Sequence, residues 1–285
     1  MDTIAGIQQV LGPNWQSFFL FITQLGSDYA YIAVLTLYYW LVDPRMGRAL
    51  GVFFGLSVTV NEALKPLLDL KRPYEVNPGI ASEAARLTAG PLNEHHPGFP
   101  SGHAQVTATL WLTMAWQQRR RWLWIVATVL VLLVSFSRLY LGVHYPIDVL
   151  AGLGIGVLLA WLAWRSGLLT VTAALAWGAV VVALVVGSLL PEWARGLAIG
   201  SAFLVSRPTF DPPRSWPARI GVAAVGLIAV VAVFLGSSLL LPEEIKRSGW
   251  GSFLRYFVLV LLATEGVPRL MRLPASRRAG YASAG

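Results

Sequence analysis

The sequence contains no cysteine, which excludes disulfide bonds, a thiolate nucleophile and a zinc–thiolate site. Charged residues are scarce as well, at 13% of the 285 residues, and a soluble domain of this length needs a more polar surface than that. Acidic residues are the rarer kind, 14 against 22 lysines and arginines, which gives a formal charge of +8. Because the arginines stand in short loops between apolar runs, we attribute this charge to membrane topology and expect no nucleic-acid partner.

Apolar residues are abundant instead. They make up 56% of the chain, and the mean hydropathy is +0.62. Several runs approach or exceed the roughly 18 residues that mark a membrane-spanning helix. We therefore predict an all-α protein, a polytopic transmembrane helical bundle, with roughly five or six helices in a core and three or four membrane segments in a carboxy-terminal extension.

The predicted spans form two groups along the chain. Residues 1–26 are predicted to be an amphipathic interfacial helix or a short first span, interrupted at Gly12 and Pro13. Clear spans are predicted at 27–42, 47–69, 102–118, 122–140 and 146–165, and a second group at 168–190, 195–206, 219–241 and 253–268. The chain thus divides into a core membrane domain at 27–166, a transmembrane extension at 167–273 and a flexible cytoplasmic tail at 274–285.

The placement of arginines predicts the orientation of these spans. Alternate loops carry them: Arg45 and Arg48; Arg119, Arg120 and Arg121; Arg165; Arg207, Arg214 and Arg219; Arg269, Arg272, Arg277 and Arg278. The positive-inside rule makes that side cytoplasmic. The extracytoplasmic side then holds the long loop 70–101 and the turn 138–145. Glu265, an acidic residue inside the last predicted span, has no explanation in this scheme.

Three clusters of polar residues stand on the predicted extracytoplasmic side. The first is KPLLDLKRP, in which Lys65 and Arg72 are seven residues apart. That spacing is nearly two helical turns, so both cations are predicted to project from one helix face. Taken alone, snorkelling of both side chains to the headgroups explains this cluster equally well.

The second cluster is HPGFPSGHAQVT, residues 96–107. Pro100 and Ser101 suit the start and the N-cap of a helix, and Gly102 lets another group approach the backbone closely. Free N–H groups at a helix N-terminus form a seat for an anion, and His103 stands in the first turn beside it. A histidine bonded to a carbonyl is the plainer interpretation of that residue.

The third cluster is SRLYLGVHYPIDVL. Arg138 ends one span, Gly142 breaks it, and His144 precedes the next span. Asp148 lies four residues after His144, so it can accept a hydrogen bond from one ring nitrogen. Such a bond fixes the tautomer and leaves the other nitrogen bare and nucleophilic. A polar tether is the alternative for an isolated pair of this kind.

Together the clusters form a stronger pattern than any one of them alone. Three cations, two histidines and one carboxylate come from three helix ends at the same membrane face. Ionisable groups at membrane depth are costly and usually functional. The cations and the helix N-terminus suit a dianionic phosphate. A carboxylate-backed histidine beside that phosphate is a candidate nucleophile, and the second histidine can protonate the departing oxygen.

In order and internal spacing, the three clusters resemble the signature of the type 2 phosphatidic acid phosphatase family of membrane lipid phosphatases. That signature is K-x6-RP, PSGH and SR-x5-H-x3-D, and every specified position is filled here. The resemblance covers about residues 27–165, so the core domain is predicted to be the phosphatase. Residues 168–285 carry no motif that can be assigned.

The resemblance implies a role for each matching residue. His144 would attack phosphorus and form a phosphohistidine, Asp148 would orient it, and His103 would protonate the leaving alkoxide and then activate water. The residues implied to hold the phosphoryl oxygens are Lys65, Arg72, Ser101, Gly102 and Arg138, with Ser137 as a minor phosphate or structural contact. No cofactor is expected, and no metal, because three fixed positive charges supply the electrostatic stabilisation. The neighbouring Glu94, His95 and His96 are not expected to bind one, since adjacent loop histidines rarely share an ion.

The predicted function is hydrolysis of the terminal phosphate of a lipid phosphate or polyprenyl diphosphate by an integral membrane enzyme of a prokaryotic plasma membrane. Its predicted partners are the lipid substrate and the bilayer, and the extension is a candidate homodimer contact. Undecaprenyl or other polyprenyl diphosphates, phosphatidic acid, phosphatidylglycerol phosphate and sphingoid phosphates all fit the signature. Two alternatives stay open: a lipid-linked phosphotransferase that uses the same phosphohistidine, and a carrier that binds phospholipid or another anion without turnover.

Overall fold

The computed structural model describes residues 2–90, 96–166 and 171–274. Every regular element in these ranges is a helix, which confirms the predicted all-α class. Glu94, His95 and the predicted tail from residue 275 onward lie outside the described residues. The chain forms two compact units, a first unit of Met1–Tyr31 with Val60–Arg165 and a second unit of Ile32–Thr59 with Ser166–Gly285.

The division into units differs from the predicted contiguous domains, because residues 32–59 belong with the extension. The chain passes from one unit to the other inside two helices, α3 (Asp28–Leu41) and α4 (Pro44–Leu68). The fully buried Trp40 of α3 donates its indole N–H to Ala263 O at 2.7 Å. This bond joins residues more than 200 positions apart in the chain, so sequence order alone does not reveal it.

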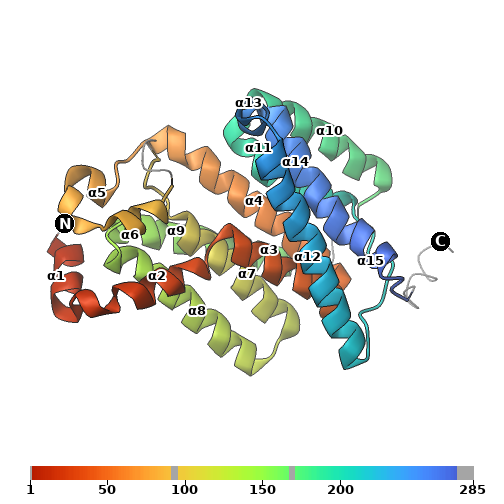
Figure 1. Ribbon diagram of the computed structural model, residues 1–285, viewed down its shortest axis with the longest axis horizontal. Helices are drawn as coiled ribbons and strands as arrows, with labels where there is room; N and C mark the ends of the chain where they lie inside the picture. The colour runs from red at the N-terminus through yellow and green to blue at the C-terminus, as the bar shows by residue number, and fades with distance from the viewer. Residues whose placement is uncertain (1, 91–95, 167–170, 275–285) are drawn as a thin grey trace. The chain divides into compact units, whose positions relative to one another are not determined.

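The first unit contains the predicted site. Its elements are α1 (Asp2–Leu11), η1 (Pro13–Trp15), α2 (Gln16–Gln24), α5 (Pro73–Val76), η2 (Pro78–Ile80), α6 (Glu83–Leu87), α7 (Gly102–Gln118), α8 (Arg121–Tyr140) and α9 (Pro146–Arg165), with parts of α3 and α4 (Figure 1). Helices α7 and α9 pack closely because two glycines of α9 face α7. A Cβ at Gly152 would lie 2.5 Å from Ser101 O, and one at Gly156 would lie 2.4 Å from Gln105 O. This approach brings the start of α7 against the start of α9.

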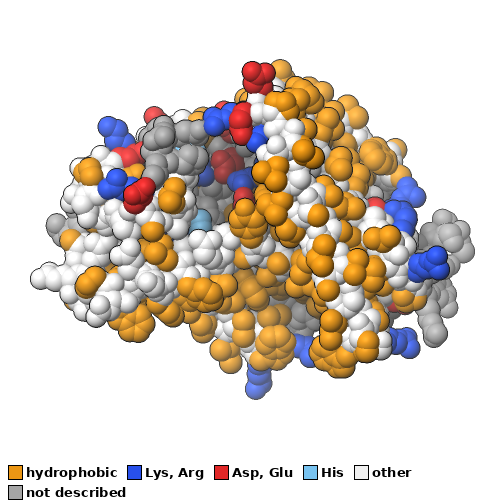
Figure 2. Space-filling model, in the orientation of Figure 1, with side chains coloured by type: hydrophobic (Ala, Val, Ile, Leu, Met, Phe, Trp, Pro, Cys, Tyr) orange, Lys and Arg blue, Asp and Glu red, His pale blue; other side chains and the backbone are white. Residues whose placement is uncertain are grey.

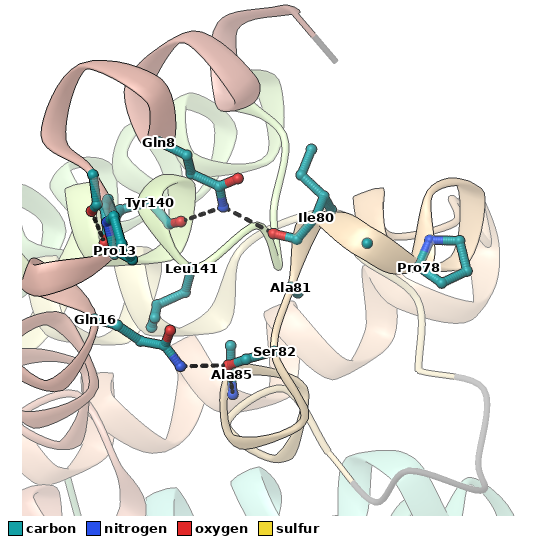
Figure 3. A pocket seen from close by; sticks show the side chains of 12 residues that line it. Gln8, Pro13, Gln16, Pro78, Ile80, Ala81, Ser82, Ala85, Tyr140 and Leu141 are labelled. Carbon is teal, nitrogen blue, oxygen red and sulfur yellow. Dashed lines mark hydrogen bonds between the residues drawn. The ribbon is translucent and has the colours of Figure 1, made fainter.

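The amino-terminal segment packs on the end of α8. Phe19 of α2 contacts Tyr140, with ring centroids 4.5 Å apart. The Gln8 amide of α1 donates to Ile80 O at 2.8 Å and to Tyr140 O at 2.7 Å (Figure 3). These groups border a pocket of about 430 Å³, and the described residues that line it are all uncharged. Helix α1 is thus fastened to the same loop and turn that carry the predicted site.

The second unit contains the extension. Its elements are α10 (Ala173–Leu189), α11 (Pro191–Val205), α12 (Trp216–Leu240), α13 (Glu243–Arg247), α14 (Gly249–Leu261), the π-helical turn η3 (Leu262–Gly266) and α15 (Val267–Leu270). Arg48 of α4 donates to Phe203 O at 3.2 Å, and Arg219 of α12 donates to Leu41 O at 2.9 Å. Loops that were predicted to share the cytoplasmic side therefore lie together in this unit.

The helices make this an integral membrane protein. Within the described residues, four helices are long and apolar enough to cross a bilayer: α8, α9, α12 and the stretch Gly249–Leu270. A fifth span is possible if Pro13–Gln24 and Asp28–Leu41, which are bent by 44°, form one crossing. Figure 2 shows apolar side chains spread over the outer faces of the helices. Fewer helices meet this criterion than were predicted, in part because α10 has only 17 residues.

Candidate active site

The helix that carries Lys65 ends before Arg72. Helix α4 stops at Leu68, and Asp69 follows with a φ of +42°. Arg72 then has an extended backbone as the N-cap of α5, because the residue before a proline is disfavoured in the helical region. The prediction that both cations share one helix face is therefore wrong. Lys65 lies on α4 with its Nζ 3.2 Å from Glu62 Oε1.

Arg72 ties the long loop to the turn before α9. It is 3% exposed, and acceptors occupy all five of its N–H groups. The acceptors are His96 O, Val143 O, His144 Nε2, Ala89 O and Pro97 O, at 2.7, 3.1, 3.0, 3.4 and 3.3 Å. Four of them are main-chain carbonyls, so only the N–H on His144 can move to a ligand without loosening the loop.

The contacts of His144 determine its tautomer. Its Nδ1 lies 3.3 Å from Asp148 Oδ2, and its Nε2 lies 3.0 Å from Arg72 Nη1. A guanidinium can only donate and an ionised carboxylate can only accept. Nδ1 therefore carries the proton and Nε2 presents a lone pair. Asp148 Oδ2 also accepts the Tyr145 N–H at 2.8 Å, which holds the carboxylate in place.

Burial and neighbouring positive charges keep the His144 ring neutral. The side chain is 2% exposed. Burial lowers its pKa well below the ordinary value, and the positive charges of Arg72 and Arg138 and the neighbouring His103 ring lower that pKa further. A neutral imidazole with a bare Nε2 is the nucleophilic form of histidine.

The PSGH segment reaches the same place from α7. The Ser101 N–H donates to Asp148 O at 2.9 Å, and Ser101 is fully buried. Ser101 occupies the N-cap of α7 but makes no capping bond, contrary to the expectation for this residue. Its Oγ has no hydrogen-bond partner among the described residues. Gly102 begins α7, where a Cβ would lie 2.9 Å from Asn61 Oδ1.

His103 stands in the first turn of α7. Its ring packs beside Gly26, whose replacement by any other residue would put a Cβ 3.1 Å from the ring carbon Cδ2. The His103 ring is one of the neighbours that lower the pKa of His144. Its nitrogens form no hydrogen bond to the part of the chain that the structure describes, so they remain available to a ligand.

One edge of the Arg138 guanidinium has no hydrogen-bond partner among the described residues. Nη1 donates to Thr23 Oγ1 at 2.6 Å and to Thr88 Oγ1 at 2.9 Å, and Nη2 donates to Thr88 O at 3.1 Å. Arg138 is fully buried, and its Nε has no partner among the described residues. The two remaining N–H groups, on Nε and Nη2, form the fork that binds a phosphate or carboxylate in a bidentate manner. Ser137, by contrast, donates to Val134 O at 2.6 Å, a contact within its own helix.

Sequence reasoning missed the residues that hold these groups. Thr23 and Thr88 orient Arg138, and no spacing in the chain marks either threonine. Asn61 donates to Pro100 O at 3.3 Å and to Gln105 Oε1 at 2.9 Å, which supports the PSGH segment. A buried asparagine in an apolar span is a visible signal in the sequence, since such a group needs partners.

Two family models match the chain. The model described as "PAP2 superfamily" matches residues 47–171. The model described as "PAP2 superfamily phosphatase, transmembrane extension" matches residues 193–277. The first range includes all three motifs, and the second lies in the part of the sequence for which no motif could be assigned.

Named relatives act on different lipids. The chain is 30% identical to undecaprenyl-diphosphatase of Sulfolobus acidocaldarius, over 52% of this chain and 66% of that protein. It is 29% identical to sphingosine-1-phosphate phosphatase 2 of Homo sapiens, over 57% of this chain and 41% of that protein. A crystal structure of a transmembrane PAP2-type phosphatidylglycerolphosphate phosphatase from Bacillus subtilis matches with a TM-score of 0.47 and 24% identity, over 57% and 81% of the two chains.

The chain spans less than two thirds of the length of each of the two curated relatives named above. The matched ranges nevertheless take in the site and most of the extension. The family predicted from the motifs is confirmed: the chain belongs to the PAP2 superfamily and carries that superfamily's transmembrane extension.

Proposed function

We propose that this protein is a membrane phosphatase that removes the terminal phosphate of a lipid phosphate through a phosphohistidine on His144. The observation that carries the proposal is the unprotonated Nε2 of a buried, neutral His144, whose ring is held by Asp148 and Arg72. Buried polar groups without partners are rare and need an explanation. A bound phosphate supplies one for Ser101 Oγ and for Arg138 Nε.

We expect phosphate to bind to the donors that have no hydrogen-bond partner among the described residues. The Nε–H and Nη2–H fork of Arg138 donates to two phosphoryl oxygens. The Ser101 hydroxyl and the free N–H groups at the start of α7 donate to the remaining ones. One N–H of Arg72 moves from His144 Nε2 to the phosphate, which frees the lone pair. Lys65 adds a positive charge at the edge of the site.

The first chemical step forms the phosphohistidine. The Nε2 lone pair of His144 makes an N–P bond while the bond from phosphorus to the lipid oxygen breaks. His103, which takes up a proton when the anionic phosphate binds beside it, gives that proton to this oxygen, which leaves as the lipid alcohol, or as the lipid monophosphate when the substrate is a diphosphate. The carboxylate of Asp148 balances the positive charge on the substituted imidazole.

The second step returns the enzyme to its starting state. His103, now neutral, takes a proton from a water molecule, and the water oxygen forms a bond to phosphorus. The N–P bond breaks, its electron pair returns to His144 Nε2, and inorganic phosphate leaves. Arg72, Arg138 and Lys65 stabilise the charge on the equatorial oxygens in both steps. Neither step requires a metal ion or a cofactor.

The substrate proposal rests on the family and the membrane. We infer that the lipid chain stays in the bilayer while the headgroup enters a site on the extracytoplasmic face of a prokaryotic plasma membrane. The names of the relatives support both polyprenyl diphosphates and sphingoid monophosphates as candidates. Homodimer formation through the extension stays a prediction.

The function is tested with a panel of lipid phosphates offered to the purified full chain in detergent. We expect inorganic phosphate to be released with multiple turnovers from at least one lipid of the panel. Phosphate that appears on an added lipid or sugar alcohol instead of in solution would favour the phosphotransferase. Tight binding of every lipid without any turnover would favour the carrier and contradict a phosphatase.

The protonation state of His144 predicts the acid limb of the pH profile. Because the pKa of His144 lies well below its ordinary value, the ring stays neutral and nucleophilic as the pH falls through about 6.5. We expect kcat/KM, corrected for the separately measured titration of the substrate phosphate, to fall only below that pH. A corrected acid limb centred at or above pH 6.5 contradicts this environment for His144.

A further inference from the structure

The second unit holds a basic pocket that the proposed phosphatase mechanism does not use. It measures about 200 Å³. Its lining comes from the loop after α11 and from the turn η3 with α15: Arg207, Thr209, Phe210, Thr264, Glu265, Pro268, Arg269, Arg272 and Leu273. The two segments are joined by a main-chain bond from Asp211 N–H to Pro274 O at 2.9 Å. The pocket is therefore built by two loops that meet at one end of the extension.

Glu265 holds these two segments together. One carboxylate oxygen accepts the Arg207 N–H at 2.6 Å, and the other lies 2.6 Å from Arg269 Nη2. The residue lies in the π-helical turn η3, a distortion that is frequent at functional sites. This geometry accounts for an acidic residue in the last predicted span. Of the three arginines that line the pocket, Glu265 forms an ion pair only with Arg269.

The other two arginines keep their charge available. Arg207 and Arg272 are both exposed, and neither guanidinium makes a hydrogen bond or ion pair with a described residue. Thr209, an exposed residue, adds a hydroxyl to the lining of the pocket. The hydroxyl of Thr264 donates to Val260 O at 2.9 Å, so it can act only as an acceptor. The donors of the pocket are thus the guanidiniums of Arg207 and Arg272, the Thr209 hydroxyl and the N–H groups of Arg269 that Glu265 does not use.

We propose that this pocket binds a phosphate group, supplied by an anionic lipid headgroup or by a free phosphate compound. Three arginines and one glutamate leave a surplus of two positive charges, which matches a phosphate group better than a single carboxylate. The volume exceeds that of several water molecules at about 30 Å³ each, which leaves room for the group and part of its hydration. The site lies at helix ends on the predicted cytoplasmic face, where headgroup phosphates are found.

Arginines at cytoplasmic helix ends also attract anionic lipids without any pocket, and the chain offers a matched control for that effect. Arg119 and Arg120 are exposed and belong to a loop predicted on the same face. Arg119 even shares the left-handed backbone of Arg272, with φ values of +51° and +49°. A double variant at either pair removes two positive charges, but only Arg207→Gln/Arg272→Gln removes them from the pocket.

The experiment measures binding of phosphatidylglycerol to the full chain in neutral detergent by native mass spectrometry. Phosphatidylglycerol carries a phosphodiester and no terminal phosphate, so the proposed catalytic site does not consume it. Arg207→Gln/Arg272→Gln is expected to weaken binding about 30-fold, since each guanidinium removed from contact with the phosphate costs about fivefold. Arg119→Gln/Arg120→Gln is expected to weaken it less than about threefold. Glu265→Gln frees Arg269 and is expected to tighten binding, a result that structural damage cannot produce.

The source of the phosphate is decided by a competition arm with inorganic phosphate. Failure of millimolar inorganic phosphate to displace the lipid supports a lipid headgroup as the ligand. Displacement that depends on Arg207 and Arg272 supports a free phosphate compound. Equal losses of affinity in the two double variants, or no loss in either, would overturn the proposed site.

Discussion

Replacement of His144 by alanine is expected to lower the rate of phosphate release at least about 10⁴-fold, with little change in KM. The reason is that no other described group near the site combines burial, a neutral ring and a lone pair fixed by two partners. Arg72 keeps its four carbonyl acceptors in this variant, so the loop and the turn stay joined. The measurement is steady-state phosphate release from the lipid that the wild-type protein hydrolyses fastest.

His96→Ala provides the matched control for that variant. The main-chain carbonyl of His96 accepts from Arg72, and alanine retains the carbonyl while removing the ring. We expect a loss of less than about tenfold from this change. Turnover by His144→Ala at a rate near that of His96→Ala would rule out the phosphohistidine.

Arg138→Lys is expected to lower kcat by about 10²–10³-fold, since one well-placed donor to a developing charge contributes this much. Lysine keeps the charge but cannot present two parallel N–H groups to phosphate. It also leaves the hydroxyls of Thr23 and Thr88 without the planar donor they now orient. The comparison is Arg121→Lys at the exposed start of the same helix, for which we expect less than a twofold change, within about 0.5 kcal/mol.

The role of Thr23 is tested together with Arg138. Thr23→Val removes one acceptor from the guanidinium and is expected to cost about tenfold in kcat/KM, while Thr23→Ser restores the hydroxyl and the activity. In the Arg138→Lys background the same change is expected to have little further effect, because the group that Thr23 positions is gone. If the double variant instead loses the product of the two single losses in kcat/KM, Thr23 acts independently of Arg138, through the stability of the protein. Thr36→Val, where the hydroxyl bonds only to its own helix, controls for the general cost of the substitution.

Long apolar runs made most of the helices predictable from the sequence. The predicted spans 122–140 and 146–165 coincide almost fully with Arg121–Tyr140 and Pro146–Arg165, since arginine and proline mark their ends. The assignment of residues 32–59 to the second unit could not be predicted. It depends on tertiary contacts such as that of Trp40 with Ala263, which no periodic pattern encodes.

In the site, local relationships were predictable and distant ones were not. Asp148 lies four residues from His144, a spacing that brings the two side chains together wherever the chain folds into its next helix. The helix-face argument for Lys65 and Arg72 was wrong because it ignored the proline after Arg72. The open hydroxyl of Ser101 was not foreseen either, since a serine at an N-cap usually bonds to the helix it begins.

The most direct measurement is the trapping of a covalent intermediate on the histidine in the turn before α9. The His103→Ala variant lacks the base that activates water, so it is expected to accumulate the phosphoenzyme when a lipid diphosphate labelled on its terminal phosphate is added, because the lipid monophosphate can leave without the acid that His103 also supplies. The account predicts up to about one label per chain, stable in alkali and lost in acid, in the peptide that contains His144. No label in any quenched sample, or label on a different residue, would contradict it.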